Sequence, residues 1–414
     1  MTPLTILSDL FGCAVAAAQP SLCLPPYLQP YEGHAGRCMV IGAGKASAAM
    51  AEAVEAHWPG TIEGLVITRH GYTRPTRSIE IALADHPVPG VAGESAARRM
   101  LDLVGGLGPD DLVICLLSGG GSALLSLPAD GISLAAKQDL TRALLVSGAP
   151  IGDINTVRKH ISAVKGGRLA AACRPARVLT LAISDVAGDE LSVIASGPTV
   201  PDPTTCAVAS DLIARYGITA PAEILAALAN GAHETPKPGD PAFADDRAVI
   251  IADAGRALAA ASVRARELGL EPVNLGADLE GEARQMAKDM AAKLDAHSGR
   301  PLVLLSGGEA TVTVTGDGKG GPNTEFLLAL ALALEGRAGT YAIACDTDGI
   351  DGSEDNAGAF LAPDTLERAR ALGLDAKAAL AGNDAHGFFS ALGDLIVTGP
   401  TYTNVNDFRA ILLT

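Results

Sequence analysis

The sequence has few aromatic residues and no excess of positive charge. Phe, Trp and Tyr make up 3% of its 414 residues. Ala, Gly, Leu and Val are plentiful instead, which suits helices packed on parallel strands more than an all-β protein. The formal net charge is −16, so we expect no general attraction to nucleic acid or anionic lipid. An anionic substrate would therefore need local cations.

The sequence also lacks a membrane span, a signal peptide and paired cysteines. No stretch reaches the ~18 consecutive apolar residues that a membrane helix needs. The N-terminus has no basic region and is interrupted by Asp9, so it resembles an amphipathic helix more than a signal peptide. The seven cysteines form no CxxC pair, which indicates reduced core thiols. We expect a soluble, cytoplasmic protein.

Three apolar strands are each followed by a glycine-containing turn: LVICLLSGGGSALL at 112–125, LVLLSGGEA at 302–310 and VIGAGKAS at 40–47. Glycines after a buried strand let backbone N–H groups approach a ligand, and a following helix favours an anion. Ser-Gly-Gly is also ordinary loop chemistry. The joint occurrence of the three turns nevertheless favours a phosphate-handling enzyme. The candidate phosphate-binding residues are Gly42, Gly44, Ser118, Gly119, Gly120, Gly121, Ser122, Ser306, Gly307, Gly308 and Glu309.

Strands and helices alternate along the first half of the chain. Expected strands at 38–41, 64–68, 79–82, 112–117 and 178–183 are joined by helices or turns, which predicts a doubly wound, Rossmann-like parallel sheet. The segment TPKPGDP at 235–241 is linker-like. We therefore predict an α/β fold of two domains, a larger N-terminal one at 1–235 and a smaller C-terminal one with a mixed sheet at 242–414. In the latter we expect a strand at 248–252, a hairpin through 311–315 and a final strand at 394–398.

Two groups of charged residues are candidate site residues. The stretch 155–170, expected on a helix, carries Arg158, Lys159, His160, Lys165 and Arg168. It is either a solvated face or a local positive field. Asp185 and Asp189 follow the strand at 178–183, where a metal-binding or catalytic carboxylate belongs in an α/β sheet, although Asp also caps turns there.

Asp346, Asp348 and Asp351 lie close together in a second acidic loop. A calcium-binding EF-hand is excluded because Ile350 and Ala357 occupy ligand positions. A Mg²⁺ site needs fewer carboxylates than a calcium-binding EF-hand, so a magnesium role remains one interpretation of this loop. A rigid Asp-Gly turn is the alternative.

Taken together, these segments resemble the class II glycerate kinases, which phosphorylate D-glycerate at the 2-hydroxyl with ATP. Relatives are often labelled hydroxypyruvate reductases because of their place in tartrate and hydroxypyruvate degradation. The matching motifs are GAGKAS at 42–47, HPVPG at 86–90, LLSGGGSALL at 116–125, VRKHISAVKGGRLA at 157–170, SDVAGDELSVIASGPT at 184–199, GGPNTEF at 320–326, TDGIDG at 347–352 and TGPTYTNVND at 398–407.

The resemblance implies two α/β domains, ATP and Mg²⁺ as cosubstrate and metal, and glycerate as the small-molecule substrate. It implies that Lys45 acts on the transferred phosphoryl group and that Asn323 contacts nucleotide or phosphate. From the residues we add the hypotheses that Asp185 and Asp189 hold Mg²⁺ or orient the acceptor hydroxyl, that Asp348 and Asp351 contribute to metal binding, and that Arg158 or Lys159 binds the substrate carboxylate.

The sequence departs from the family pattern at one functional position. The pattern usually reads GGRNQE before the apolar helix, whereas this chain has Pro322 and Thr324, so the arginine is not carried over. Two alternatives to the kinase stay open. One is an NAD(P)H-dependent hydroxypyruvate reductase, although Ser47 replaces the third glycine of a dinucleotide fingerprint. The other is a ligand sensor. A homodimer is left open, and no nucleic-acid or membrane partner is expected.

Overall fold

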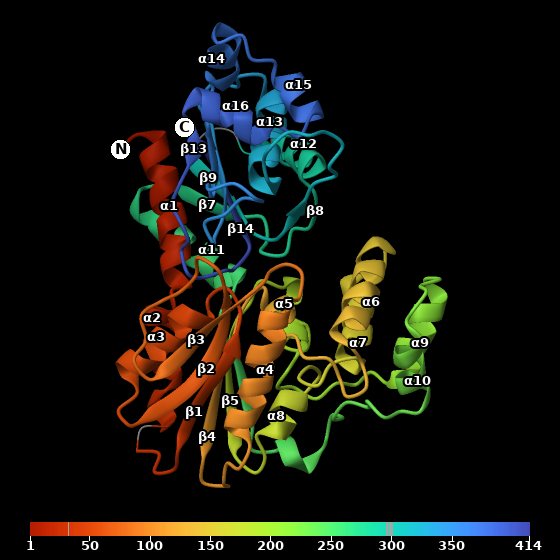
Figure 1. The fold of residues 1–414 in the computed structure, drawn as a ribbon. Helices are drawn as coiled ribbons and strands as arrows, with labels where there is room; N and C mark the ends of the chain where they lie inside the picture. The colour runs from red at the N-terminus through yellow and green to blue at the C-terminus, as the bar shows by residue number, and fades with distance from the viewer. Residues whose placement is uncertain (32, 295–296, 298–300) are drawn as a thin grey trace. The chain divides into compact units, whose positions relative to one another are not determined.

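The computed structural model describes residues 1–31, 33–294, 297 and 301–414. The chain forms two compact units (Figure 1). The N-terminal unit is Pro20–Ile251, and the C-terminal unit combines Met1–Gln19 with Ala252–Thr414. This division differs from the predicted one at 1–235 and 242–414. The proline-containing segment at 235–241 lies inside the N-terminal unit, because Thr235 is buried and donates a hydrogen bond to Asp202 at 3.2 Å.

A six-stranded sheet with the order β3-β2-β1-β4-β5-β6 organises the N-terminal unit. The pairs β3–β2, β2–β1, β1–β4 and β4–β5 are parallel. Both β1 and β4 are buried at every position, as expected for strands covered on both faces. The strands are β1 (Cys38–Ala43), β2 (Ile62–Arg69), β3 (Ile79–Ala84), β4 (Leu112–Leu117), β5 (Arg177–Ile183) and β6 (Arg247–Ala252).

Helices cover both faces of this sheet. Helix α4 runs along the sheet in Figure 1, and together with α8 it shares a core with alternate residues of the strands, such as Ile41 and Cys115. Helix α3 contacts β1, β2 and β4. The doubly wound α/β prediction is therefore confirmed. The helices here are α2 (Pro20–Cys23), α3 (Ser47–His57), α4 (Val91–Val104), α5 (Gly121–Leu124) and α8 (Arg168–Ala172), with 3-10 turns η1 (Pro25–Tyr27), η2 (Gln29–Tyr31), η3 (Ala187–Asp189), η4 (Ile194–Ser196) and η5 (Pro241–Phe243).

Four further helices form a lobe with an apolar core of its own, which Figure 1 shows apart from the strands. They are α6 (Leu134–Val146), α7 (Ile151–His160), α9 (Cys206–Arg215) and α10 (Ala222–Ala229), and we call them the helical lobe. The stretch 155–170, expected on a helix, is not one continuous helix. It is divided into α7 and α8 because Gly166 and Gly167 adopt φ of +59° and +86°, which a continuing helix does not allow.

The C-terminal unit contains a second six-stranded sheet with the order β13-β12-β11-β14-β9-β7. It is mixed, as predicted: β7 and β9 are parallel, and the other pairs are antiparallel. The strands are β7 (Glu271–Asn274), β9 (Leu302–Ser306), β11 (Thr340–Asp346), β12 (Gly358–Leu361), β13 (Leu395–Ile396) and β14 (Asp407–Leu413). The expectation that 394–398 is the last strand is wrong, because β14 follows it and lies inside the sheet.

The predicted hairpin through 311–315 is also wrong. β10 (Ala310–Thr311) instead pairs in parallel with β8 (Gly281–Glu282). The apolar helix α13 (Pro322–Leu334) contributes most of its residues to the core of this unit. The remaining helices are α11 (Ala254–Glu267), α12 (Ala283–Lys293), α14 (Thr365–Ala371), α15 (Ala376–Ala381) and α16 (Ala385–Leu392).

The N-terminal helix α1 (Pro3–Ala17) belongs to the C-terminal unit. It packs on α11 and β14, with Phe11 and Phe408 ring centroids 5.8 Å apart. Arg264 of α11 donates to the Asp9 carboxylate at 2.7 Å. All seven cysteines are free thiols. No single helix in the described ranges is long and apolar enough to span a membrane, although Pro3–Ala17 and Pro20–Tyr27 pass a length and composition criterion jointly.

Candidate functional site

The first two glycine turns lie against each other at the carboxyl ends of β1 and β4. These strands end in register, with Ala43 beside Leu117. The Lys45 amide donates to the Gly119 carbonyl at 2.8 Å, and the Ala46 amide donates to Ser118 Oγ at 2.9 Å. The two loops therefore form one platform that holds Lys45.

Glycine is required where the loops touch. Gly44 has φ of +147°, and a Cβ there would lie 2.1 Å from Ser118 Oγ. Gly120 has φ of +77°, and its Cβ would approach His86 Nε2 at 3.0 Å and Lys45 Cγ at 3.5 Å. The Lys45 and His86 side chains thus flank the same loop. The amides of Gly119 and Gly120 have no hydrogen-bond acceptor among the described residues, which leaves two donors for an anion.

Behind this loop lie three cations that form no ion pair with a carboxylate of the described residues. Lys165 is 1% exposed, and its ammonium donates to the Ser122 carbonyl at 2.8 Å. Lys137 of α6 donates to the Leu127 carbonyl at 3.1 Å. Arg158 of α7 makes no ion pair with any residue that the structure describes. We call Lys137, Arg158 and Lys165 the cation cluster.

Burial lowers the pKa of all three members of the cation cluster, and mutual repulsion adds to this for the two lysines. Burial, together with the nearby Arg158 charge, lowers the pKa of Lys137 to about 7. Burial, followed by the charges of Arg158 and Lys137, lowers the pKa of Lys165 well below its usual value. Burial also lowers the pKa of Arg158 to about 10. Buried charges of the same sign destabilise the folded protein, and a bound anion would reduce that destabilisation.

A chain of hydroxyl and amide groups links the glycine loop to α7. Ser122 Oγ lies 2.7 Å from Ser196 Oγ, which donates to Asn155 Oδ1 at 3.2 Å. Ala195 and Ser196 have positive φ of 52° and 62°, a conformation that non-glycine residues adopt at a cost. This backbone directs the Ala195 carbonyl to Lys165 Nζ, 3.4 Å away. The strained segment therefore helps to fix the buried lysine.

The other cations of the 155–170 stretch have internal partners. Lys159 is buried, and its Nζ lies 3.3 Å from Asp202 Oδ1. Arg168 donates to the carbonyls of Lys159 and Ser162 at 2.7 and 2.6 Å, so it closes the loop between α7 and α8. The stretch is therefore not a solvated face. Of the two residues proposed to bind the substrate carboxylate, only Arg158 lacks an acidic partner in the described chain.

Asp185 and Asp189 follow β5, the strand next to β4 in the sheet. Both side chains are half-buried. Asp189 has φ of 54° and follows Gly188, whose φ is 77°. The topology therefore brings them to the edge of the sheet that carries Lys45 and Ser118, as predicted. Their roles in metal or hydroxyl binding stay predictions.

The third glycine turn belongs to the C-terminal unit, at the end of β9. Its strand-end serine, Ser306, is buried, whereas Glu309 is exposed. A Cβ on Gly308 would lie 2.2 Å from the Leu279 carbonyl oxygen, and the Gly307 amide already donates to the Gly276 carbonyl at 2.9 Å. The buried Arg409 donates to the Gly307 carbonyl at 3.2 Å. Much of this turn is therefore committed to internal contacts.

Asp351 caps α13. Its carboxylate accepts from the amides of Asn323 and Thr324, each at 2.9 Å, and from the Thr324 hydroxyl at 2.8 Å. Burial raises the pKa of Asp351 to about 6 in spite of these hydrogen bonds. The structure thus gives Asp351 a capping role at a helix N-terminus. Asp348 is buried and accepts from the Ile350 amide at 2.8 Å, an Asx turn of the kind considered as the alternative to a metal site.

Asn323 lies between two carboxylates at the start of α13. Its Nδ2 donates to Asp407 Oδ1 at 2.6 Å and lies 3.4 Å from Asp351 Oδ1. Because both neighbours are acceptors, the amide orientation is fixed, and Oδ1 is left buried with no hydrogen-bond partner among the residues that the structure describes. This unpartnered oxygen is a candidate ligand contact.

Comparisons with known proteins agree with this architecture. Residues 6–229 match the family described as a domain of unknown function, DUF4147, and residues 302–407 match the MOFRL family. A D-glycerate 2-kinase from Thermotoga maritima is 40% identical over 90% of this chain and 89% of its own length. The chain belongs to the glycerate 2-kinase family. The solved structure of the Thermotoga maritima glycerate kinase, at 37% identity, covers 99% of both chains with a TM-score of 0.90.

Members of this family do not all carry a kinase name. A relative from Agrobacterium vitis with the provisional name hydroxypyruvate reductase is 52% identical over 99% of this chain and 94% of its own. The family match nevertheless confirms the two-domain α/β prediction and the family resemblance found in the sequence.

Sequence reasoning missed several residues around the glycine loop: Lys137, Asn155 and Ser196, and also His86, which lies beside Gly120. His86 and Ser196 stand in the motifs HPVPG and SDVAGDELSVIASGPT, so a signal was present. Lys137 stands in no such motif, and nothing in the sequence distinguishes it from an ordinary surface lysine on a helix.

Proposed function

We propose that this chain transfers the γ-phosphoryl group of ATP to the 2-hydroxyl of D-glycerate and releases 2-phosphoglycerate. The observation that carries the proposal is the cation cluster behind the SGGGS loop, in a protein whose net charge is −16. Both substrates are anions, and phosphoryl transfer depends on positioning and on neutralising charge spread over phosphate oxygens. Membership of the glycerate 2-kinase family supports the same activity.

The N-terminal unit supplies most of the proposed machinery. Lys45 stabilises the transferred phosphoryl group, and the amides of Gly119 and Gly120 donate to its oxygens. Arg158 binds the glycerate carboxylate, with Lys137 and Lys165 adding positive potential. Lys159 is left out of substrate binding, because Asp202 already neutralises it. Asp189 orients the acceptor hydroxyl.

We assign Mg²⁺ to Asp185 and Asp189. Half-exposed carboxylates at a strand end fit a cation that keeps several waters and takes one or two protein oxygens. Bound there, Mg²⁺ would neutralise phosphate charge. Asp351 is a poorer candidate, since both of its oxygens accept hydrogen bonds from α13. In the C-terminal unit, Ser306–Glu309 and Asn323 remain the proposed nucleotide contacts, supported by the unpartnered Oδ1 of Asn323.

The structure gives little support to a nicotinamide-dependent reductase. Ser47 takes the place of the third fingerprint glycine, and its hydroxyl donates to the Leu116 carbonyl at 3.3 Å. Arg69, the cation at the end of β2 that could meet an NADP 2′-phosphate, lies over the Tyr72 ring with 5.1 Å between its Cζ and the centroid. We further propose action in the cytoplasm, where free thiols persist.

The direct test is turnover by the purified protein. With D-glycerate, ATP and Mg²⁺ we expect ADP formation, and the product should be consumed by enolase without a mutase, which identifies 2-phosphoglycerate. Lys45→Met should lower kcat at least 100-fold, a loss typical of a removed electrostatic group. Lys293→Met, on the exposed end of α12, is the matched control and should turn over normally. NAD(P)H oxidation with hydroxypyruvate, in the absence of ADP formation, would overturn the proposal.

A further inference from the structure

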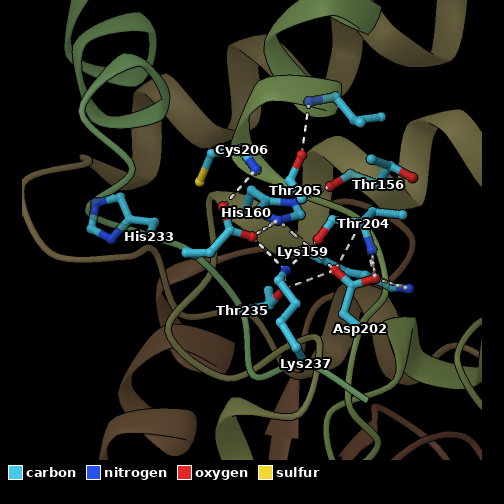
Figure 2. Close-up of polar contacts among 12 residues, drawn as sticks. Thr156, Lys159, His160, Asp202, Thr204, Thr205, Cys206, His233, Thr235 and Lys237 are labelled. Carbon is cyan, nitrogen blue, oxygen red and sulfur yellow. Dashed lines mark hydrogen bonds and ion pairs between the residues drawn. The ribbon is translucent and has the colours of Figure 1, made fainter. Parts of the chain in front are cut away.

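A cluster of metal-ligating side chains lies at the base of the helical lobe, and the proposed kinase reaction does not use it. His160 ends α7, Cys206 begins α9, and Glu234 follows α10. One ligand atom from each of the three lies within 4.8 Å of the other two. Figure 2 shows His160 and Cys206 close together, with Asp202 and Lys237 beside them. From this geometry we propose that His160, Cys206 and Glu234 bind a zinc ion.

The distance between two of the ligand atoms fits tetrahedral zinc. Zn–N and Zn–O distances of about 2.0–2.2 Å and a Zn–S distance of about 2.3 Å place neighbouring ligand atoms roughly 3.3–3.7 Å apart. His160 Nε2 lies 3.5 Å from Glu234 Oε1. A nitrogen, a sulfur and an oxygen donor form a set typical of zinc rather than of Mg²⁺ or Ca²⁺. Three protein ligands leave a fourth position for water.

The His160 ring is already oriented as a metal ligand. Its Nδ1 lies 2.9 Å from the Thr156 carbonyl oxygen, which can only accept, so Nδ1 carries the proton. The lone pair of Nε2 then points away from α7. A hydrogen bond of this kind fixes the tautomer of many zinc-binding histidines.

None of the residues that the structure describes donates to that lone pair. The side chain of His160 is completely buried. Its Nε2 instead faces two carboxylates, Glu234 at 3.5 Å and Asp202 at 3.9 Å. A neutral acceptor facing carboxylate oxygens is unfavourable unless a cation lies between them. A metal ion would satisfy all of these atoms.

Cys206 and Glu234 are held together by the start of α9. The Cys206 amide donates to Glu234 Oε2 at 3.0 Å, which fixes the carboxylate beside the thiol. Cys206 is the first residue of the helix after its cap, Thr205, which places its thiol at the helix N-terminus. The Glu234 side chain is 40% exposed, so a metal ion has access from solvent.

Lys237 is the competing cation. Its ammonium forms an ion pair with Glu234 Oε1 and also contacts Thr235 Oγ1 at 2.7 Å. A carboxylate oxygen has more than one lone pair, so zinc and Lys237 could share Glu234, but with mutual repulsion. Removal of this lysine should therefore strengthen zinc binding, an effect that a merely structural ion pair would not produce.

The test uses the full-length protein stripped with a chelator and titrated with Co²⁺ and then Zn²⁺. We expect one Co²⁺ per chain with a thiolate-to-metal charge-transfer band, which Zn²⁺ abolishes. Cys206→Ser should remove the band, Glu234→Gln should weaken affinity at least 10-fold, and Lys237→Met should tighten it. Cys23→Ser, a half-buried cysteine outside the cluster, is the matched control and should bind as the wild type does.

Two results would overturn the zinc site. The first is the absence of a thiolate band in the wild-type protein at micromolar Co²⁺. The second is metal uptake that is unaltered in both Cys206→Ser and Glu234→Gln. Circular dichroism of each variant separates a lost ligand from lost folding, and Glu234→Gln keeps an acceptor for the Cys206 amide. Kinase turnover is measured in parallel, so failure of the zinc site and failure of the proposed kinase are distinguished.

Discussion

Replacing Lys137 by methionine should stabilise the protein and impair its catalysis. Burial, together with Arg158, lowers the pKa of this lysine from 10.5 to about 7. That shift corresponds to about 5 kcal/mol between the two protonation states, of which about 4 kcal/mol opposes folding at pH 7. Methionine preserves most of the alkyl packing and removes the charge. We expect an increase of about 2–4 kcal/mol in the free energy of unfolding.

No new unsatisfied group offsets this gain. Lys137 donates to the Leu127 carbonyl, but that oxygen also accepts from the Ser162 hydroxyl at 3.1 Å and the Ala163 amide at 3.0 Å. The carbonyl therefore stays paired in the variant. The variant should instead lose activity. With one cation fewer behind the SGGGS loop, kcat/KM for glycerate should drop at least 10-fold, so that stability is gained while activity is lost.

The lowered pKa of Lys137 also makes the stability of the wild type depend on pH. Between pH 7 and 10.5 the unfolded lysine binds a proton that the folded one has lost, so wild-type stability rises with pH across this window. Lys137→Met lacks that rise. The difference in the free energy of unfolding between Lys137→Met and the wild type should therefore decrease from pH 7 to pH 10.

Urea unfolding at pH 7 and pH 10, followed by circular dichroism, measures both quantities. Arg142→Met on the exposed face of α6 is the matched control, because its ion pair with Asp139 is solvent-exposed and should change stability by less than about 1 kcal/mol. A Lys137→Met variant that is less stable than the wild type, or a stability difference that does not change with pH, would refute the idea that the buried Lys137 charge destabilises the fold.

Three further outcomes are expected. The KM of the wild type for glycerate should rise as pH increases above about 7, because Lys137 then loses the proton that attracts the anion; initial rates from pH 6 to 9 measure this, and the rise should be absent in Lys137→Met. For Asp351, whose folded pKa is raised from 3.8 to about 6, the contribution to stability is present below pH 3.8 and lost as pH rises through 6. The free energy of unfolding of the wild type should accordingly fall by about 3 kcal/mol between pH 4 and 7 because of this group, and urea unfolding of Asp351→Asn should not show that fall. Gly44→Ala should abolish ADP formation and lower the melting temperature, since its Cβ would lie 2.1 Å from Ser118 Oγ; a fully active variant would show that the platform tolerates displacement.

Strands with unbroken apolar runs were predictable, and strands containing buried charge were not. β1 and β4 were found because every residue is apolar or glycine and both faces are covered. β14 was missed, although all seven of its residues are buried. It contains Arg409, whose charge interrupts the apolar pattern and is neutralised by Asp407, two residues earlier on the same strand. A central strand of this kind is visible only when its long-range partners are known.

The candidate site shows the same division. The glycine turns and Lys45 follow directly from motif and topology, because parallel strands bring their carboxyl ends to one edge. The roles of individual cations did not follow. Lys159 and Arg158 are neighbours in sequence, yet one is paired with Asp202 and the other has no acidic partner in the described ranges. Which cation is available depends on burial and on residues more than 40 positions away, such as Asp202.

The placement of α1 in the C-terminal unit has a consequence for biosynthesis. Its apolar side chains, among them Leu7, Leu10 and Phe11, are buried in the folded protein, but their partners α11 and β14 leave the ribosome only after Pro20–Ile251 has been made. At a translation rate of about 5–20 residues per second, the apolar face of the nascent helix α1 stays exposed to solvent for on the order of tens of seconds. Folding of the C-terminal unit thus depends on a helix that is translated before the N-terminal unit, and proteolytic loss of α1 would destabilise the C-terminal unit rather than the unit that follows α1 in the sequence.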